Sequence, residues 1–256
     1  MGVLDRFRLD GRVALVTGGA RGLGRVAADA LAEAGASVAV TSRDKNSAES
    51  AAAELHGQKG AAALGLAVDV SERSDVDAAV GAVLDRFGRL DILINNAGIN
   101  RRGPIDAVSE DDWDAVIDTN LKGPWLFCKR CLEPMKRNGW GRVVNVSSML
   151  GEVGLAERTL YTASKGGLTL LTRTLALEWA GLGINVNALC PGPFATDINK
   201  ALLENPQAAA VIMNHVPLAR WGDPTELGPA FVFLSSEASS YMTGAVMLVD
   251  GGYTAR

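Results

Sequence analysis

The sequence predicts a doubly wound α/β fold, with a seven-stranded parallel sheet and a single domain over residues 1–256. Short runs rich in valine and isoleucine alternate with longer segments of helical period, which is typical of repeated βαβ units. Several of these runs are apolar at consecutive positions, as expected of strands covered by helices on both sheet faces. No linker, repeat or low-complexity tract interrupts the alternation, so one domain accounts for the chain.

The expected strands are the seven short apolar runs, at residues 12–17, 37–42, 62–68, 90–96, 142–147, 184–190 and 245–252. Helices are expected where apolar residues recur with helical spacing, at residues 24–35, 71–88 and 162–183. The first closes on Gly35 as a cap, and the second opens on a serine cap and closes on Gly88. Residues 193–222 form a longer, less regular excursion after the sixth strand, where a substrate lid would sit.

Composition excludes several classes of function. The net charge is -4 and the basic residues are scattered, which argues against nucleic acid or an anionic membrane as the main partner. No apolar run reaches the roughly 18 residues of a spanning helix. The opening residues also lack the apolar core of a signal peptide. We therefore expect a cytoplasmic protein that acts on a small molecule.

The three cysteines are poor material for a disulfide framework. Cys128 and Cys131 form a CxxC pair, which is typical either of a metal or redox centre or of two small side chains on one helix face. A zinc site would need a second ligand pair, and the two histidines, His56 and His215, lie far away in unrelated contexts. We favour helix packing and expect no metal site.

The segment TGGARGLG places Gly18, Gly22 and Gly24 between the first strand and a helix. Glycines at such a turn let the backbone approach a pyrophosphate, which the N–H groups of the helix start then bind. The spacing, T-G-x-x-x-G-x-G, differs from the simple GxGxxG, and glycines in a turn also serve tight packing. The flanking strand and helix favour a nucleotide, and hence a Rossmann-type fold.

The second strand ends in TSRD, at the position that contacts the adenosine ribose in a dinucleotide fold. An acid at this position suits NAD, whereas an arginine suits the 2′-phosphate of NADP. Ser42 stands where the acid would be and Arg43 follows it, with Arg21 of the glycine-rich turn as a second cation. Asp44 either contacts a ribose or, more simply, caps the next helix. We expect NADP(H) rather than NAD as the cofactor.

The third and fourth strands end in Asp69 and in the pair Asn95 and Asn96, at the sheet edge where ligands bind in open α/β folds. Aspartate and asparagine are also common in turns. Two amides in succession after an apolar strand nevertheless indicate a hydrogen-bonded network, because buried amides need partners.

The segment YTASK places Lys165 one helical turn after Tyr161. A phenol with a pKa of about 10 is a poor base, and a nearby lysine would lower that pKa by favouring the ionised form. Ser148 ends the fifth strand and brings a hydroxyl to the same sheet edge. A Tyr/Lys pair alone is usually amphipathic surface, but beside this serine and the glycine-rich turn it indicates proton transfer.

Together these motifs resemble the classical short-chain dehydrogenase/reductase family over nearly the whole chain. The matching positions occur in the family's order, and they are Thr17, Gly18, Gly22, Gly24, Asp69, residues 95–98, Asn120, Ser148, Tyr161, Lys165 and residues 191–196. The resemblance implies that Tyr161 is the general acid/base, that Ser148 donates to the substrate oxygen and that Lys165 binds the nicotinamide ribose. It also implies that Asn120 holds a water in the proton relay.

From the motifs and the resemblance together, we expect a set of residues to bind the cofactor, with Thr196 and its neighbours at the nicotinamide carboxamide. The set is Gly18, Arg21, Gly22, Leu23, Gly24, Ser42, Arg43, Asp69, Val70, Asn96, Ala97, Gly98, Tyr161, Lys165, Pro191, Gly192 and Thr196.

Within the family, residues 98–104, 196–207 and 219–228 are most similar to sugar-acid members such as gluconate 5-dehydrogenase. An NADP-dependent enzyme of a sugar acid, such as gluconate or 5-ketogluconate, is therefore the first expectation. The 3-oxoacyl carrier-protein reductases share every catalytic motif, so that activity or a broad carbonyl reductase stays open. A nucleotide-sensing scaffold would have lost part of the catalytic set. Family members are commonly homotetramers, which long helices at 110–138 and 159–182 would support.

Arg101 and Arg102 directly follow the fourth strand and its NNAG turn. Adjacent arginines in a loop are often solvated surface. The alternative is that one of them binds a substrate carboxylate bidentately and so orients a sugar acid. Arg101, Arg102 and Ser148 are thus the candidate substrate-binding residues.

Overall fold

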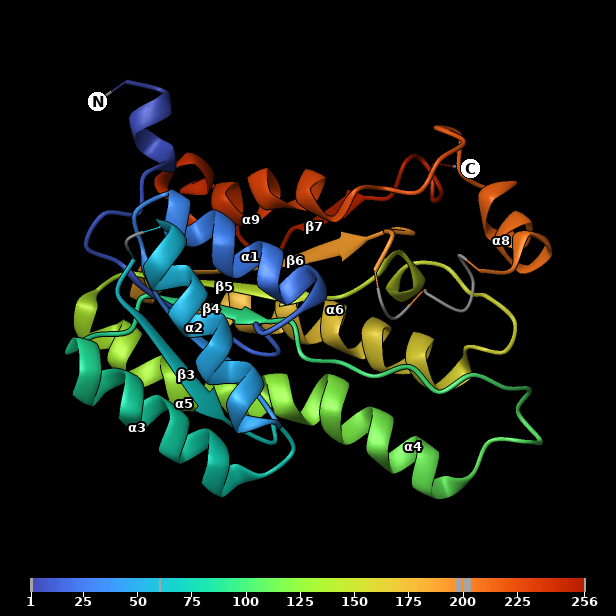
Figure 1. Cartoon of the computed structure of the whole chain (residues 1–256), viewed down its shortest axis with the longest axis horizontal. Helices are drawn as coiled ribbons and strands as arrows, with labels where there is room; N and C mark the ends of the chain where they lie inside the picture. Colours follow the sequence, from blue (N-terminus) through green and yellow to red (C-terminus); the bar gives the residue numbers. More distant parts are fainter. Residues whose placement is uncertain (1, 60, 197–198, 200–203, 256) are drawn as a thin grey trace.

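A computed structural model describes residues 2–59, 61–196, 199 and 204–255 of the chain. Its seven strands form one sheet in the order β3-β2-β1-β4-β5-β6-β7, and every neighbouring pair is parallel (Figure 1). The strands are β1 Val13–Val16, β2 Ser37–Ser42, β3 Ala63–Ala67, β4 Ile92–Asn95, β5 Gly141–Val146, β6 Ile184–Pro191 and β7 Val246–Val249. The predicted fold class is confirmed, including the reversal of strand order between β1 and β4, where ligands bind in such sheets.

Helices cover both faces of the sheet (Figure 1). One face packs against α1 Gly22–Glu33, α2 Lys45–Lys59 and α9 Gly228–Ser235, and the other against α3 Arg73–Phe87, α5 Gly123–Asn138 and α6 Thr159–Trp179. Each face has its own apolar core, built around Leu31 and Phe231 on the first and around Phe127 and Trp179 on the second. The central strands are therefore buried on both faces, which explains their uninterrupted apolar sequence.

The parallel register brings the carboxyl ends of the strands to one edge. Asn95 pairs with Asn145 across β4 and β5, and Pro191 pairs with Val249 across β6 and β7. Residues far apart in the sequence consequently meet at this carboxyl edge. No helix in the described part of the chain is long and apolar enough to cross a membrane.

Two helical segments differ from the sequence prediction. Helix α3 starts at Arg73 rather than on a serine cap, because the Ser71 hydroxyl donates to Asp69 (2.6 Å) instead of capping the helix. The segment 110–138 is α4 (Glu110–Ile117) and α5 joined by a π-helical turn, Asp118–Lys122. The excursion at 193–222 contains α8, Pro206–Met213, while residues 197–198 and 200–203 lie outside the described residues.

The cysteines are free thiols in the protein interior. Cys128 and Cys131 pack on one face of α5 in the second core. Burial raises the pKa of Cys128 to about 12 and raises that of Cys131 as well, so both thiols stay protonated at neutral pH. The structure thus supports helix packing for the CxxC pair.

Candidate active site

The turn between β1 and α1 has the conformation that its glycines require. Gly18 and Gly22 have φ angles of 63° and 55°, in the left-handed region that favours glycine. A Cβ on Gly24 would clash with the carbonyl oxygen of Gly18, whereas a Cβ on Gly22 would meet no atom within 4 Å. The turn is therefore closely packed at Gly24 and open to solvent at Gly22. Arg21 is exposed at the start of α1, whereas Leu23 packs against the core. This shape fits a bound phosphate.

Asn96 holds this turn against the end of β4. Its side-chain Nδ2 donates to the carbonyl oxygens of Thr17 (3.0 Å) and Gly18 (3.2 Å). The Thr17 hydroxyl in turn accepts from the backbone N–H groups of Asn96 (3.0 Å) and Ala97 (3.1 Å). The Asn96 side chain thus holds the shape of the glycine-rich turn, and Thr17, a matching position to which the sequence assigned no role, braces the same turn.

Asp44 caps α2, which is the simpler of its two predicted roles, the other being contact with a ribose. Its carboxylate accepts from the backbone N–H (2.8 Å) and hydroxyl (2.6 Å) of Ser47, and these hydrogen bonds lower the pKa of Asp44. Ser42 accepts from the Asp44 backbone N–H (3.2 Å) and so shapes the turn between them. Arg43, between the two, is exposed to solvent.

Asp69, at the end of β3, lies within electrostatic reach of Arg43. Its pKa is lowered first by the hydrogen bond from the Ser71 hydroxyl and further by the charge of Arg43. Val70 is buried beside Asp69. The charge of Arg43 is therefore near the carboxyl ends of β2 and β3, where an adenosine binds in this type of sheet.

A buried amide network lies beneath the site. Asn95 Nδ2 donates to Asn145 Oδ1 (2.8 Å) on the neighbouring strand, and Asn145 Nδ2 donates to the Thr172 hydroxyl (2.9 Å) of α6. The expected network at Asn95 and Asn96 is present, because both amides are hydrogen-bonded below the carboxyl edge.

Ser148, Tyr161 and Lys165 converge at the carboxyl edge between β5 and α6. The Ser148 hydroxyl accepts from the Leu150 N–H (3.1 Å) and lies near enough to the Tyr161 phenol to act on its pKa. Lys165 is 4% exposed, and its Nζ donates to the Val146 carbonyl (2.7 Å) and lies 5.7 Å from the centre of the Tyr161 ring. Two hydroxyls and one ammonium thus lie together at the carboxyl edge, as proton transfer to a carbonyl oxygen requires.

The pKa of Tyr161 differs from the sequence expectation. Burial raises it above its usual value, while the hydrogen bond with Ser148 and the charge of Arg102 act to lower it. Lys165 is itself desolvated, which lowers its pKa to about 8, and its ammonium is directed to the Val146 carbonyl. The predicted lowering of the phenol pKa by Lys165 is therefore wrong for the chain alone, because desolvation is the larger effect.

Asn120 lies in the π-helical turn, which directs its side chain inward, where it is fully buried. Its carboxamide accepts from the Ile99 N–H (2.9 Å) and donates to the Ile99 carbonyl (2.9 Å) and the Ser164 hydroxyl (3.1 Å). A Cβ on Gly98 would lie 3.3 Å from Asn120 Oδ1 and 3.6 Å from Lys165 Nζ. Asn120 thus fastens the loop after β4 to α6, and Ser164 is a second bracing residue that sequence reasoning missed.

The end of β6 approaches β7 closely. The Gly192 N–H donates to the Val249 carbonyl (2.9 Å), and a Cβ on Gly192 would clash with the Asp250 backbone. Pro191 is buried, and Thr196 lies half-buried just after this turn. The structure therefore brings Pro191, Gly192 and Thr196 to the same carboxyl edge.

The segment around α8 packs over this edge. Ile212 and Val216 form a buried cluster with Met149 and Leu150, and the Tyr161 ring packs against it. The described part of the segment 193–222 thus packs beside Tyr161 through apolar side chains, and its role as a substrate lid stays a prediction.

The two loop arginines have different environments. Arg101 forms an exposed ion pair with Asp112, with 3.5 Å between Nε and Oδ1. Arg102 donates from Nη2 to Asn199 Oδ1 (3.5 Å), and its charge acts on Tyr161. Arg102, rather than Arg101, is the loop arginine at the active site.

A further cation, Arg158, escaped sequence reasoning. It lies at the start of α6, three residues before Tyr161. Its pKa is lowered by burial and then by the charge of Arg102. Its position three residues before Tyr161 was the available signal in the sequence. Only the fold brings the loop after β4 beside Arg158.

Known proteins are similar to this chain over nearly its whole length, including the residues of the site. A family model described as enoyl-(acyl carrier protein) reductase matches residues 18–254. The chain belongs to the short-chain dehydrogenase/reductase family. It is an NAD(P)-dependent oxidoreductase, and the predicted set Asn120, Ser148, Tyr161 and Lys165 is complete, which argues against the scaffold alternative.

Relatives of nearly equal similarity carry different substrate names. D-threitol dehydrogenase of Mycolicibacterium smegmatis is 40% identical over 97% of this chain and 95% of its own. The 3-oxoacyl-[acyl-carrier-protein] reductase FabG of Vibrio harveyi is 39% identical over 96% and 98%. The 5-keto-D-gluconate 5-reductase of Escherichia coli is 39% identical over 97% of both chains. Sequence similarity alone therefore leaves the substrate open.

Among solved structures, a gluconate 5-dehydrogenase from Burkholderia cenocepacia, in complex with NADP and tartrate, superimposes with a TM-score of 0.96. It is 39% identical to this chain, and the alignment covers all of both chains. The predicted similarity to gluconate 5-dehydrogenase-like members is thereby confirmed.

Proposed function

We propose that this short-chain dehydrogenase/reductase transfers a hydride between NADP(H) and the secondary alcohol or ketone of a sugar acid, such as gluconate and 5-ketogluconate. The observation that carries the proposal is the convergence of Ser148 and Tyr161 at the carboxyl edge, where Lys165 Nζ lies 5.7 Å from the phenol ring and the charge of Arg102 acts on the phenol. The first two side chains suit a carbonyl oxygen, and the arginine suits an anionic substrate. The relatives named for 5-ketogluconate and gluconate support the same class.

The residues of the carboxyl edge fit a nicotinamide dinucleotide. The glycine-rich turn, open at Gly22, would hold the pyrophosphate at the start of α1, and Asp69 with Val70 would border the adenosine. Lys165 would reach the nicotinamide ribose, close to Gly98. The cofactor, when bound, supplies or accepts the hydride.

The chain's own groups move the proton. A ketone oxygen beside Tyr161 accepts a hydrogen bond from Ser148 and takes the phenol proton as negative charge develops on the oxygen. The resulting phenolate is stabilised by the charge of Arg102, which lowers the pKa of Tyr161, while the Ser148 proton stays with the substrate oxygen. The Lys165 ammonium, 5.7 Å from the ring centre, adds a buried positive charge. In alcohol oxidation the same groups act in reverse.

Preference for NADP(H) over NAD(H) is supported by the cations around the adenosine position. Arg43 is exposed and faces Asp69, and Arg21 is exposed at the start of α1. Guanidinium groups bind a phosphate bidentately, whereas an acid at Ser42 would repel it. Three solved relatives hold NADP, which agrees with this preference.

Substitution of Tyr161 by phenylalanine tests the proton-transfer role. We expect Tyr161→Phe to bind NADPH normally and to lose activity by about two to four orders of magnitude, the range for removing a general acid/base. Activity is followed by NADPH absorbance with 5-ketogluconate and with L-sorbose, which carries a primary alcohol in place of the carboxylate. Retention of more than about a tenth of wild-type kcat would contradict the role of Tyr161 as general acid/base.

The alternative activity is reduction of 3-oxoacyl carrier-protein thioesters or of carbonyl compounds in general. FabG of V. harveyi is as similar to this chain as the 5-ketogluconate reductase. A 3-oxoacyl thioester in the same assay distinguishes them. Higher kcat/KM for the thioester, or equal kcat/KM for 5-ketogluconate and L-sorbose, would favour the alternative.

A homotetramer in the cytoplasm is proposed for the assembled enzyme. Leu170 and Leu177 are exposed on α6, two helical turns apart, and Trp113 and Trp125 are exposed on α4 and α5. Exposed apolar side chains on these helices support contacts between subunits. Three free buried thiols support a reducing compartment. Sedimentation equilibrium measures the assembly, and a monomer mass would contradict it.

A further inference from the structure

Arg158 is tied to the loop that carries Arg102. Its Nη1 donates to the Glu157 carbonyl oxygen (2.8 Å), and the same oxygen accepts from the Gly103 N–H (3.2 Å). The carbonyl of one residue therefore joins the start of α6 to the loop after β4. This contact places the Arg158 guanidinium beside the segment of Arg102, three residues before Tyr161 in the chain.

The position of Arg158 is unfavourable for stability alone. The start of a helix is the positive end of its dipole, where a cation is disfavoured. Burial and the charge of Arg102 lower the pKa of Arg158, while the charge of Glu157 raises it. No ion pair joins Arg158 to a carboxylate within the described ranges of the chain. Glu157 also has a φ of 60°, in the left-handed region that non-glycine residues rarely adopt.

Three segments thus meet around Arg102: its own loop, the start of α6, whose Glu157 carbonyl accepts from the Gly103 N–H, and Asn199, whose Oδ1 accepts from Arg102 (3.5 Å). Two neighbouring guanidinium groups repel each other, and an anion between them removes that repulsion. Strain and like charge gathered at one place are typical of a ligand site.

We infer that Arg158 is a second substrate-binding cation, which shares the substrate carboxylate with Arg102 and so determines specificity for acids over neutral sugars. The inference rests on the proposed function and adds a residue to it. The carboxylate accepts hydrogen bonds from both guanidinium groups, and its anchoring on α6 orients the keto carbon relative to Tyr161 on the same helix.

The test compares Arg158→Ala and Arg158→Lys with wild type and with Arg137→Ala, an exposed arginine at the end of α5. For Arg158→Ala we expect KM for 5-ketogluconate to rise about tenfold or more, the loss of one charge-assisted contact. The parameters for L-sorbose, the dissociation constant of NADPH and the melting temperature should match those of Arg137→Ala. Arg158→Lys should recover part of the lost KM, because it keeps the charge but not the bidentate geometry.

The outcomes separate the inference from the proposed function. Wild type that uses L-sorbose as well as 5-ketogluconate would overturn the substrate class, and the inference with it. Wild type that prefers the acid, with Arg102→Ala raising KM and Arg158→Ala equal to Arg137→Ala, would overturn the inference alone. Equal losses on both substrates in Arg158→Ala would show that Arg158 only supports the fold of α6, and this too would overturn it. A loss confined to the acid, and partly restored in Arg158→Lys, would support it.

Discussion

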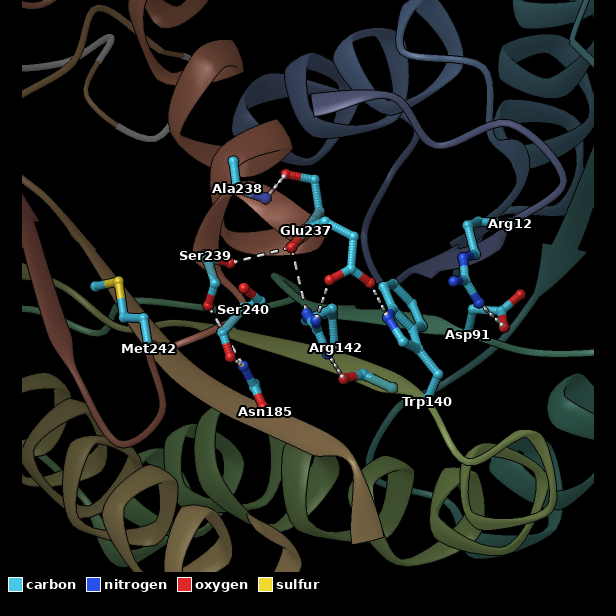
Figure 2. Close-up of polar contacts among 12 residues, drawn as sticks. Arg12, Asp91, Trp140, Arg142, Asn185, Glu237, Ala238, Ser239, Ser240 and Met242 are labelled. Atoms are coloured by element: carbon cyan, nitrogen blue, oxygen red, sulfur yellow. Dashed lines mark hydrogen bonds and ion pairs between the residues drawn. The ribbon is translucent and has the colours of Figure 1, made fainter. Parts of the chain in front are cut away.

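The two edges of the sheet bury positive charge in opposite ways. At the amino edge, Arg142 is 3% exposed, yet its guanidinium donates to the carbonyls of Gly141 (2.8 Å) and Ser236 (3.4 Å) and pairs with Glu237 (3.6 Å), as Figure 2 shows. Arg12 and Arg142 both lie over the Trp140 ring, 3.7 and 4.3 Å from its centre. Every charge in this amino-edge cluster therefore has a partner.

Asp91 completes the amino-edge cluster. Its fully buried carboxylate accepts from the Val13 N–H (3.0 Å), forms two hydrogen bonds with Arg89 (2.7 Å each) and pairs with Arg12 (3.4 Å). At the carboxyl edge, by contrast, the residues described include no carboxylate within 4 Å of Lys165 or Arg158. The comparison shows that the charges of the amino edge are paired within the protein, whereas Lys165 and Arg158 at the carboxyl edge have no carboxylate partner among the described residues, an arrangement that costs stability.

The largest expected effect follows from removing the Asp91 carboxylate from the amino-edge cluster. Asp91→Ala should lower the free energy of unfolding by about 3 kcal/mol, because the buried Val13 N–H loses its acceptor and the partly exposed Arg89 and Arg12 lose charge-assisted hydrogen bonds. Urea unfolding measures this, with the exposed Glu133→Ala as a control that should change it by less than about 0.5 kcal/mol. A loss below about 1 kcal/mol would show that water replaces the carboxylate, and would remove the distinction between the edges.

A cation at the carboxyl edge should instead affect binding. Arg43→Ala should weaken NADPH binding by about 1.5–3 kcal/mol, the value of one charge-assisted contact, and leave NADH nearly unchanged. Its free energy of unfolding should stay within about 0.5 kcal/mol of wild type, since Arg43 is exposed. Fluorescence titration with both cofactors measures the effect. An equal loss of affinity for NADPH and NADH would show that Arg43 supports the structure and does not bind the 2′-phosphate.

The smallest expected effect is a gain in stability, opposite in sign to the loss expected for Asp91→Ala. Lys165→Met should abolish activity yet raise the free energy of unfolding by about 1–2 kcal/mol at pH 7, by removing a buried charge. Burial lowers the pKa of Lys165 to about 8, whereas the unfolded chain keeps the usual 10.5. From pH 8 to 10.5 only the unfolded chain holds this proton, so wild-type stability rises with pH and the gain of the variant shrinks. A gain that stays constant up to pH 10.5 would show that the lysine charge is not its source.

Local patterns were sufficient for the fold. All seven strands were predictable, because apolar runs reflect burial on both faces wherever the strands finally lie. The glycine-rich turn and the spacing of Ser148, Tyr161 and Lys165 were equally readable, since parallel strands end at one edge. The helix caps were less so, because Ser71 prefers Asp69 as its partner over the start of α3.

The sequence by itself therefore determined the doubly wound sheet and the side chains that reach its carboxyl edge. Only the tertiary structure decided that Asn96 braces the glycine-rich turn, that the charge of Arg102 acts on Tyr161 while Arg101 pairs with Asp112, and that Arg158 lies near the loop of Arg102. It also decided that burial raises the pKa of Tyr161. The physical reason is that strand and helix periodicity is encoded within a few residues, whereas charge pairing and desolvation depend on segments dozens of residues apart, which meet only in the folded chain.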